Sequence, residues 1–302
     1  MPPSALRPAA VVLGLILLAT AGCRPAEKAY TVNLSVPAKI GEKSTVVTTS
    51  TTTLETLVKL GVGDQAPIPV KRQSQKRVVR LTAEVETLAV FPNGGVQQAA
   101  LALTSLRVAL DDKPETDVLP AGTKVVAAST SDGQVTFTVN AQPADDKVAE
   151  ILRLVFEPGS PERTDQAKFG PKGPVVIGAA WPIDGALFAG QFKNEFGAAS
   201  TCEGAMHLDA VTGEGPGQLA AVSGAVAMHG LRAPLPDPFV TKSGDGQSQL
   251  KAGVTAGHVG TDTLSMTLDF NFQSEAPGPS GGQLTATIQM GGRRETSVTY
   301  HP

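Results

Sequence analysis

The sequence predicts a mainly β protein of two similar antiparallel β-rich halves, residues 31–156 and 175–302, with one helix between them. Apolar and polar residues alternate with period two over most of the chain, as in strands with one buried face. Clusters of Gly, Pro, Asn and Asp separate these segments, and helical periodicity is confined to one stretch. Because a flat sheet would leave a large apolar face in water, we expect a curved sheet, an open barrel or paired sheets.

Residues 1–22 have the pattern of an export signal. Arg7 precedes an apolar run over residues 9–23, which is shorter than the roughly 17–25 residues of a membrane-spanning helix. A charged start, a short apolar core and small residues at its end are typical of a cleaved signal peptide.

Residues 17–23 (LLATAGC) resemble the lipobox of bacterial lipoprotein signal peptides. The resemblance implies cleavage before Cys23 and a diacylglyceryl group on its thiol, with residues 23–30 as a tether to the membrane of the cell envelope. Two or three acyl chains hold a protein on a bilayer far better than one. Arg24 in place of Asp implies sorting to the outer membrane, at its periplasmic face or the cell surface, if the bacterium has two membranes. Thr20 departs from the usual Leu, and the alternative is an ordinary secretory signal with an incidental cysteine.

The composition describes a folded, weakly acidic protein. The chain has 25 basic and 28 acidic residues and 41% hydrophobic residues. Removal of residues 1–22 deletes Arg7 and no acid, which leaves 24 basic and 28 acidic residues and a net charge of −4. This balance argues against a nucleic-acid partner, and the hydrophobic content is sufficient for a sizeable core.

The first half, residues 31–156, is predicted to contain two hairpins and to end in a helix. One hairpin joins alternating residues 80–86 to residues 101–110 across the turn at residues 92–95, and the other turns at residues 131–133. The helix begins near Pro143 and Asp145, where acidic side chains suit the positive end of the helix dipole. Apolar residues then recur at helical spacing: Val148, Ile151, Leu152 and Val155.

Two segments rich in Pro, Gly and charge are predicted as loops. Residues 157–174 are interpreted as the linker between the halves, and residues 232–253 as a second long loop.

The second half, residues 175–302, is predicted to contain further hairpins. Its expected strands cover residues 206–210, 219–228, 264–272, 284–290 and 293–300. Turns are expected at residues 213–217, at residues 276–282 and at Gly291-Gly292, because glycine adopts the positive φ angles of tight turns.

Short repeated strings suggest that the halves are duplicated. Gly-Gln precedes a strand at residues 133–134, 217–218 and 282–283, while Ile40-Gly41 and Ile177-Gly178 open the two halves. Glycine followed by a polar residue is also ordinary turn chemistry, so duplication and coincidence both stay open.

A basic stretch is the strongest local concentration of charge; its members are Lys71, Arg72, Lys76, Arg77 and Arg80. It would suit anionic headgroups or lipopolysaccharide. The alternative is a solvated loop that enters an edge strand, where charge discourages aggregation.

No motif with a confirming context predicts catalysis, a cofactor or a metal. The four histidines lack the spacing of zinc proteases, and His207 with Asp209 would form either a metal site or, as the favoured alternative, a polar face. The glycine-rich residues 213–217 precede a strand rather than the helix of a phosphate-binding loop. Cys202 is interpreted as a small core residue, with a reactive thiol as the alternative. We therefore expect a protein that is not an enzyme.

The aromatic residues allow two interpretations. Trp181 lies near Phe188, Phe192 and Phe196, which predicts a core plug, with an aromatic-lined pocket as the alternative. Residues Met266, Phe270, Phe272 and Met290 would line a pocket on a curved sheet or fill an ordinary core.

The string Ile177–Gly178 to Trp181, followed by long hairpins, resembles uncharacterised β-rich bacterial lipoproteins of a domain-of-unknown-function family, a resemblance that implies no activity. The sequence therefore predicts a membrane-anchored envelope lipoprotein that acts as a binding or interaction module for an apolar ligand or lipid. The alternative is a structural or assembly lipoprotein that engages envelope proteins.

Overall fold

The computed structural model describes residues 28–63, 65–131, 134–159, 165–190, 192, 196–197, 201–257, 259–278 and 282–301. The predicted signal peptide and Cys23 lie outside these ranges. Every strand, helix and core residue reported below lies between residues 28 and 301, so a chain that begins at Lys28 keeps all of these contacts.

Thirteen strands form one sheet in the described part of the chain. They are β1 (Lys43–Val62), β2 (Ile68–Val90), β3 (Val96–Leu110), β4 (Thr116–Leu119), β5 (Lys124–Ser129), β6 (Val135–Val139), β7 (Gln142–Pro143), β8 (Ala180–Pro182), β9 (Thr201–Thr212), β10 (Leu219–His229), β11 (Val240–Thr255), β12 (Gly260–Pro277) and β13 (Gln283–His301). The helical segments are α1 (Asp146–Arg153), α2 (Asp165–Phe169), α3 (Gly185–Gly190) and the 3₁₀ turn η1 (Gly215–Gly217).

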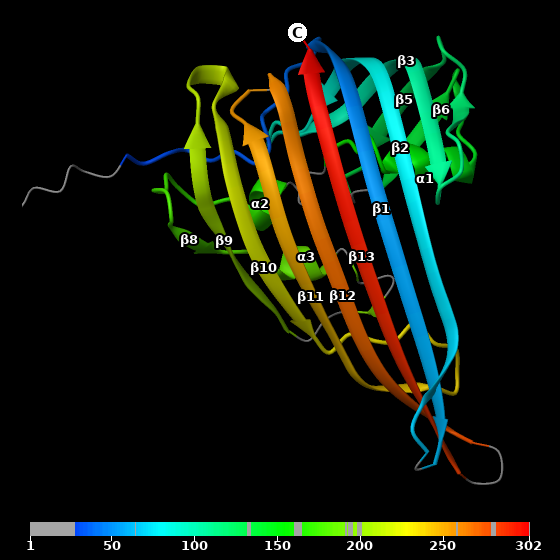
Figure 1. Cartoon of the computed structure of the whole chain (residues 1–302). Helices are drawn as coiled ribbons and strands as arrows, with labels where there is room; N and C mark the ends of the chain where they lie inside the picture. Colours follow the sequence, from blue (N-terminus) through cyan, green and yellow to red (C-terminus); the bar gives the residue numbers. More distant parts are fainter. Residues whose placement is uncertain are drawn as a thin grey trace, which may run out of the picture.

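The sheet runs in the order β7-β6-β5-β3-β2-β1-β13-β12-β11-β10-β9-β8, with β4 paired to β3, and all its strand pairs are antiparallel. β1 and β13 lie side by side in the middle, and the sheet curves around the helices (Figure 1). The mainly β, antiparallel fold is confirmed, and among the predicted alternatives the structure is a single curved sheet.

The two faces of the sheet differ because side chains alternate across each strand. On β12, Phe270 and Phe272 are buried on the concave face, whereas Asp269 and Asn271 are exposed on the convex face. This is the alternation predicted for residues 264–272. The concave face carries the core, and the convex face is mostly Thr, Ser, Gln and charged residues, which suits a sheet with one wet side.

The first half buries an aliphatic core under α1. Leu81, Leu101 and Val125 from three strands pack with Leu152 of the helix. The Asp145 side chain caps α1 by accepting a hydrogen bond from the Val148 amide at 2.9 Å, which satisfies an amide that the helix itself leaves unpaired. The predicted helix is therefore confirmed.

The second half buries an aromatic core under α2 and α3. Phe192 and Phe196 pack against Phe270, and Phe196 also packs against Phe272; the Phe196 and Phe270 ring centroids are 4.7 Å apart. Phe188 joins the cluster through an edge-to-face contact with Phe192. Packing of these rings on one another confirms the core plug. Sequence analysis did not predict α2 or α3, which have five and six residues and no resolvable period.

The predicted linker contributes to this second core. Residues 157–174 include α2, whose Phe169 is 6% exposed and accepts a hydrogen bond on its carbonyl oxygen from Trp181 Nε1 at 2.7 Å. A segment that is polar in composition therefore anchors the one tryptophan of the chain.

The predicted loop over residues 232–253 is wrong, because residues 240–253 belong to β11. Two of the inward positions of this strand, Gly244 and Gly246, are glycine, and a third, Ser248, is polar. A Cβ atom on Gly246 would lie 2.8 Å from a Phe270 ring carbon and 2.9 Å from the Met228 methyl carbon. The large rings of β12 fill the space that inward side chains of β11 would take, so the strand lacks the apolar alternation on which the prediction depended.

The predicted turn at Gly291-Gly292 is also wrong, since β13 continues through both residues. Gly292 lies between Leu54 of β1 and Leu268 of β12 in the ladder. An added Cβ atom would meet a Leu54 methyl carbon at 3.5 Å. This is an ordinary van der Waals distance, so the glycine continues the strand and does not reverse the chain.

The other predicted turns are present where the structure describes them. β2 and β3 join across residues 92–95, with Gly94 at φ +83°, and β9 and β10 join across η1. The suggested duplication stays a prediction. The amides of Gly41 and Gly178, at φ +80° and +83°, each donate to a strand carbonyl, of Thr87 and Leu208 respectively.

Candidate lipid-contact surface

Four strands extend beyond the rest of the sheet and form a protruding end. β2 pairs with β3 only from Arg77 onward, so its first nine residues have β1 as their neighbour. On the other side of β1 the ends of β13 and β12 pair as far as the turn between them. We call this protrusion the tip and define it as residues 54–63, 65–75, 274–278 and 282–287. It lies at the bottom of Figure 1.

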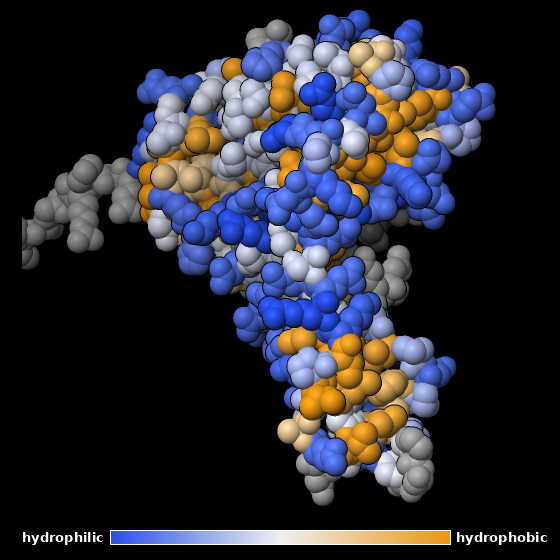
Figure 2. All heavy atoms as spheres, turned by 45° about the vertical axis from the view of Figure 1, so that its right-hand side comes forward, coloured by the Kyte–Doolittle hydropathy of each residue, from blue (hydrophilic) through white to orange (hydrophobic). Residues whose placement is uncertain are grey.

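The tip carries large apolar side chains in contact with solvent. The exposed fractions are 53% for Leu54, 54% for Val62, 65% for Ile68 and 53% for Val70. Figure 2 shows the hydrophobic surface gathered on the protrusion and separated from the body by a hydrophilic belt. Contiguous exposed apolar surface on a soluble domain commonly marks an interaction site.

Three basic residues surround the base of this apolar end. The ladder pairs Val58 with Lys71 and Leu57 with Arg72, while Lys59 lies opposite Pro69 after a bulge. Lys59 is half-buried, and Lys71 and Arg72 are exposed. The described salt bridges include none of these three.

The predicted basic stretch lies on a strand rather than in a loop. Its residues lie in two environments, the tip and the interior of the sheet. Residues 71–76 lie on the part of β2 whose outer edge is unpaired among the described strands, as an edge strand would be. Arg77 and Arg80 lie inside the sheet. Arg77 pairs with Glu150 of α1 at 2.5 Å, and Arg80 pairs with Glu115. Only the first part of the stretch is therefore available at the tip.

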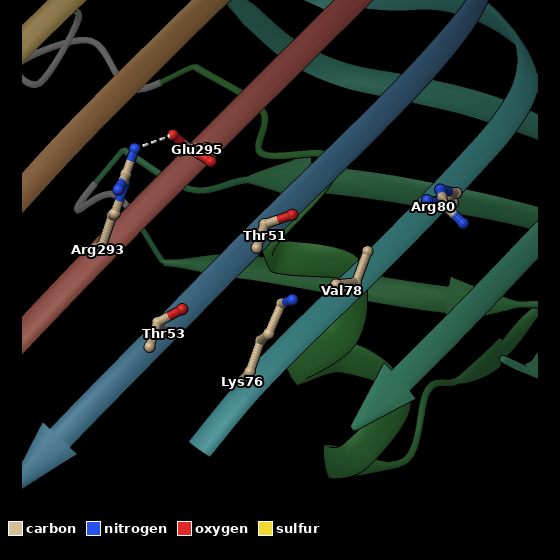
Figure 3. Close-up of a pocket in the computed structure, with 7 residues that line it drawn as sticks. All are labelled: Thr51, Thr53, Lys76, Val78, Arg80, Arg293 and Glu295. Atoms are coloured by element: carbon tan, nitrogen blue, oxygen red, sulfur yellow. Dashed lines mark hydrogen bonds and ion pairs between the residues drawn. The ribbon is translucent and has the colours of Figure 1, made fainter. Parts of the chain in front are cut away.

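A groove of about 440 Å³ lies on the convex face above the tip (Figure 3). Lys76 and Arg80 of β2, Thr51 and Thr53 of β1, and Arg293 of β13 contribute to its lining. Glu295 pairs with Arg293 at 2.5 Å. Because Glu115 and Glu295 already neutralise two of its three cations, the groove offers little net charge to an anion.

The other residues considered as site candidates do not converge. His207 and Asp209 are both exposed on the convex face, and Asp209 accepts a hydrogen bond from the Ser223 hydroxyl at 3.0 Å, which confirms the polar-face interpretation. Among the described residues, no three His, Cys, Asp or Glu side chains gather in a way that would hold a metal ion.

Cys202 is half-buried at the edge of the aromatic core, as a small core residue would be. Burial raises the pKa of its thiol, which disfavours the nucleophilic thiolate. Cys23, the predicted lipidation site, lies outside the described residues.

The residues suggested to line a ligand pocket contribute to the core. Phe270 and Phe272 are buried in the aromatic cluster, and Met266 and Met290 are half-buried against it. The tip was not predicted as a site. One feature of the sequence could have indicated it: the apolar residues Val62 and Ile68 flank a polar turn. Residues beside an exposed turn are usually polar.

Within the described residues, no helix is both long and apolar enough to cross a bilayer. Neither a family model nor a curated protein matches the chain. Among solved structures, the chain is similar to "Lipid-protein interactions in lipovitellin", with 10% sequence identity and a TM-score of 0.33. The likeness covers 87% of this chain and 25% of that one, so the chain spans a quarter of that protein's length. At this TM-score it carries no argument about function.

Proposed function

We propose that the protein is a non-enzymatic, lipid-anchored binding module of the bacterial cell envelope that engages lipid through the tip. The observation that carries this proposal is the exposed apolar surface of Leu54, Val62, Ile68 and Val70. The strands that carry these side chains pair with one another, but the outer edge of β2 has no strand neighbour beside Ile68 and Val70. That edge would stay at the polar surface while the side chains contact the apolar phase.

The strength of this contact follows from the area available. Fully burying a Val, Leu or Ile side chain contributes about 1.5–3 kcal/mol, and roughly half of each side chain is exposed here. Each therefore supplies about 1 kcal/mol on transfer into lipid. The tip would bind a bilayer weakly and reversibly, which suits transient contact rather than permanent insertion.

Tyr30, seven residues after the proposed anchor at Cys23, lies at the end of the strands opposite the tip. Tyr30 pairs with Val175 and lies near Val211 and Val254, where β9 and β11 end. The tip is at the opposite end of the same sheet (Figure 1). The anchor and the tip would therefore not compete for the same space.

Vesicle flotation tests the proposal. We use a chain that begins at Lys28, because the lipid anchor would bind vesicles by itself, and neutral phosphatidylcholine vesicles as the probe. Replacing Val62, Ile68 and Val70 together by Ser should weaken binding by roughly 100-fold, since three contributions of about 1 kcal/mol are removed. Circular dichroism confirms that the variant is folded.

The matched control replaces three exposed apolar residues far from the tip, Ile40, Ile177 and Val259, by Ser. This variant should bind as the parent does. Equal binding by the tip variant and the parent, or no binding by either, contradicts the proposal. Co-purification of the parent with an envelope protein in place of lipid would instead support the assembly role.

The anchor and the absence of catalysis have their own tests. Mass spectrometry of the mature N-terminus should find a diacylglyceryl-modified peptide that starts at Cys23, and an unmodified Cys23 would contradict the anchor.

Catalytic turnover by the purified mature chain would contradict the non-enzymatic role.

A further inference from the structure

Apolar and basic residues occupy different positions along the tip. Val62 and Ile68 lie toward its end, and Lys59, Lys71 and Arg72 lie behind them in the ladder. A bilayer has the same order, with acyl chains beneath a layer of headgroups. Lysine and arginine side chains are long enough to reach headgroups while neighbouring apolar residues enter the acyl region.

The charge of this region is positive. Residues 59–72 contain three basic residues and one acidic residue, Asp64, which falls outside the described residues, so their net charge is +2. The tip also contains two acids: Glu55, which is exposed four residues before Lys59 on β1, and Glu275 of β12, which Lys242 neutralises at 3.0 Å. With Glu55 included, residues 54–75 have a net charge of +1. By contrast, the chain as a whole has a net charge of −3.

We propose that the tip selects bilayers that contain anionic phospholipids, with Lys59, Lys71 and Arg72 placed at the headgroup phosphates. This inference rests on the proposed lipid contact and adds the class of lipid. Each cation near an anionic surface strengthens binding about fivefold. The three together supply a preference of about 100-fold for anionic over neutral vesicles at low salt, and salt weakens it by screening.

The test replaces Lys59, Lys71 and Arg72 together by Gln in the chain that begins at Lys28. Binding is measured by flotation with vesicles of phosphatidylcholine alone and of equal parts phosphatidylcholine and phosphatidylglycerol. We expect the variant to lose about 100-fold in affinity for the anionic vesicles and to bind neutral vesicles as before. High salt should reduce binding of the parent to anionic vesicles and leave the variant unaffected.

The matched control replaces Lys39, Lys113 and Lys124 by Gln, three exposed lysines outside the tip. It should retain the preference for anionic vesicles. Loss of the preference in this control, or its persistence in the tip variant, would show that overall charge is responsible and would overturn the inference.

The outcomes separate the two proposals. Binding of the parent to neutral and anionic vesicles with equal affinity overturns the anionic selection and leaves the lipid contact standing. Failure of the Ser variant of Val62, Ile68 and Val70 to weaken neutral-vesicle binding overturns the lipid contact itself.

Discussion

The same long strands behave differently in the body of the sheet and at the tip. On β2, Val79 is fully buried beneath the first core, whereas Ile68, near the start of the same strand, is 65% exposed. On β12 burial persists further, through Ser274 and Ala276, and exposure begins at Pro277 beside the turn. The difference lies in what covers the concave face: α1 and the aromatic cluster cover the body. Apolar residues of the body therefore stabilise the fold, and those of the tip are available for other contacts.

The largest expected effect is in the aromatic core. Replacing Phe272 by Ala removes a ring that packs against Phe196 and Phe270, and such truncations cost about 3–5 kcal/mol. Chemical denaturation should show this loss in the free energy of unfolding. A change below about 1 kcal/mol would mean that the second half is not a packed core.

A pair of glycines gives the next effect. Gly244→Ala would place a methyl group against the Leu231 carbonyl oxygen, and the resulting overpacking should cost about 3 kcal/mol. Gly291→Ala has its nearest neighbour at 3.5 Å and should leave stability unchanged or slightly raised. Thermal unfolding of the two variants compares them directly. Equal loss in both would contradict the explanation given for β11.

The pKa of Tyr300 measures how well the body of the sheet excludes water from this side chain. Burial, with a smaller contribution from the Asp262 carboxylate, raises the pKa of Tyr300 to about 12. Since the folded-state pKa is higher than that of the unfolded chain, this group's contribution to stability is complete below the unfolded value and lost as pH rises through 12. An absorbance titration should lose its late step in Tyr300→Phe. A step near the ordinary tyrosine value would show that this face is open to water.

The smallest expected effect is at the tip. Ile68→Ser and Val70→Ser should each change the free energy of unfolding by less than about 0.5 kcal/mol, because exposed side chains contribute little to the folded state. Denaturation curves for the single variants measure this. A loss of 2 kcal/mol or more would place the tip in the core and remove the distinction from the body.

Sequence patterns predicted the elements whose side chains alternate between water and core. β12 has inward Phe270 and Phe272, and α1 has a capping Asp145 before its apolar stripe. β11 was missed because its inward Gly244 and Gly246 leave space for rings supplied by another strand. The sequence of a strand shows no apolar alternation where side chains of a neighbouring strand fill the space at its inward positions.

The candidate site was missed for a related reason. β1 is rich in threonine, and its inward Thr48 and Ser50 are buried although they are polar. Whether Val62 or Ile68 is covered depends on how far β1 and β2 extend beyond β3, a property of the pairing register rather than of local composition. The basic stretch is evident in the sequence. Which of its residues lie at the tip and which lie inside the sheet also depends on the pairing register.

The pairing of β1 with β13 also determines how the molecule assembles. Thr45 lies opposite His301, so the central ladder joins residues from the two ends of the described chain. Contacts of such long sequence separation form slowly, because the chain loses loop entropy before they stabilise it. While the chain is synthesised from its N-terminus, β1 lacks one neighbour until β13 emerges. We therefore expect the two halves of the sheet to remain unpaired until that point, and loss of the last strand would divide the sheet at its middle rather than shorten its edge.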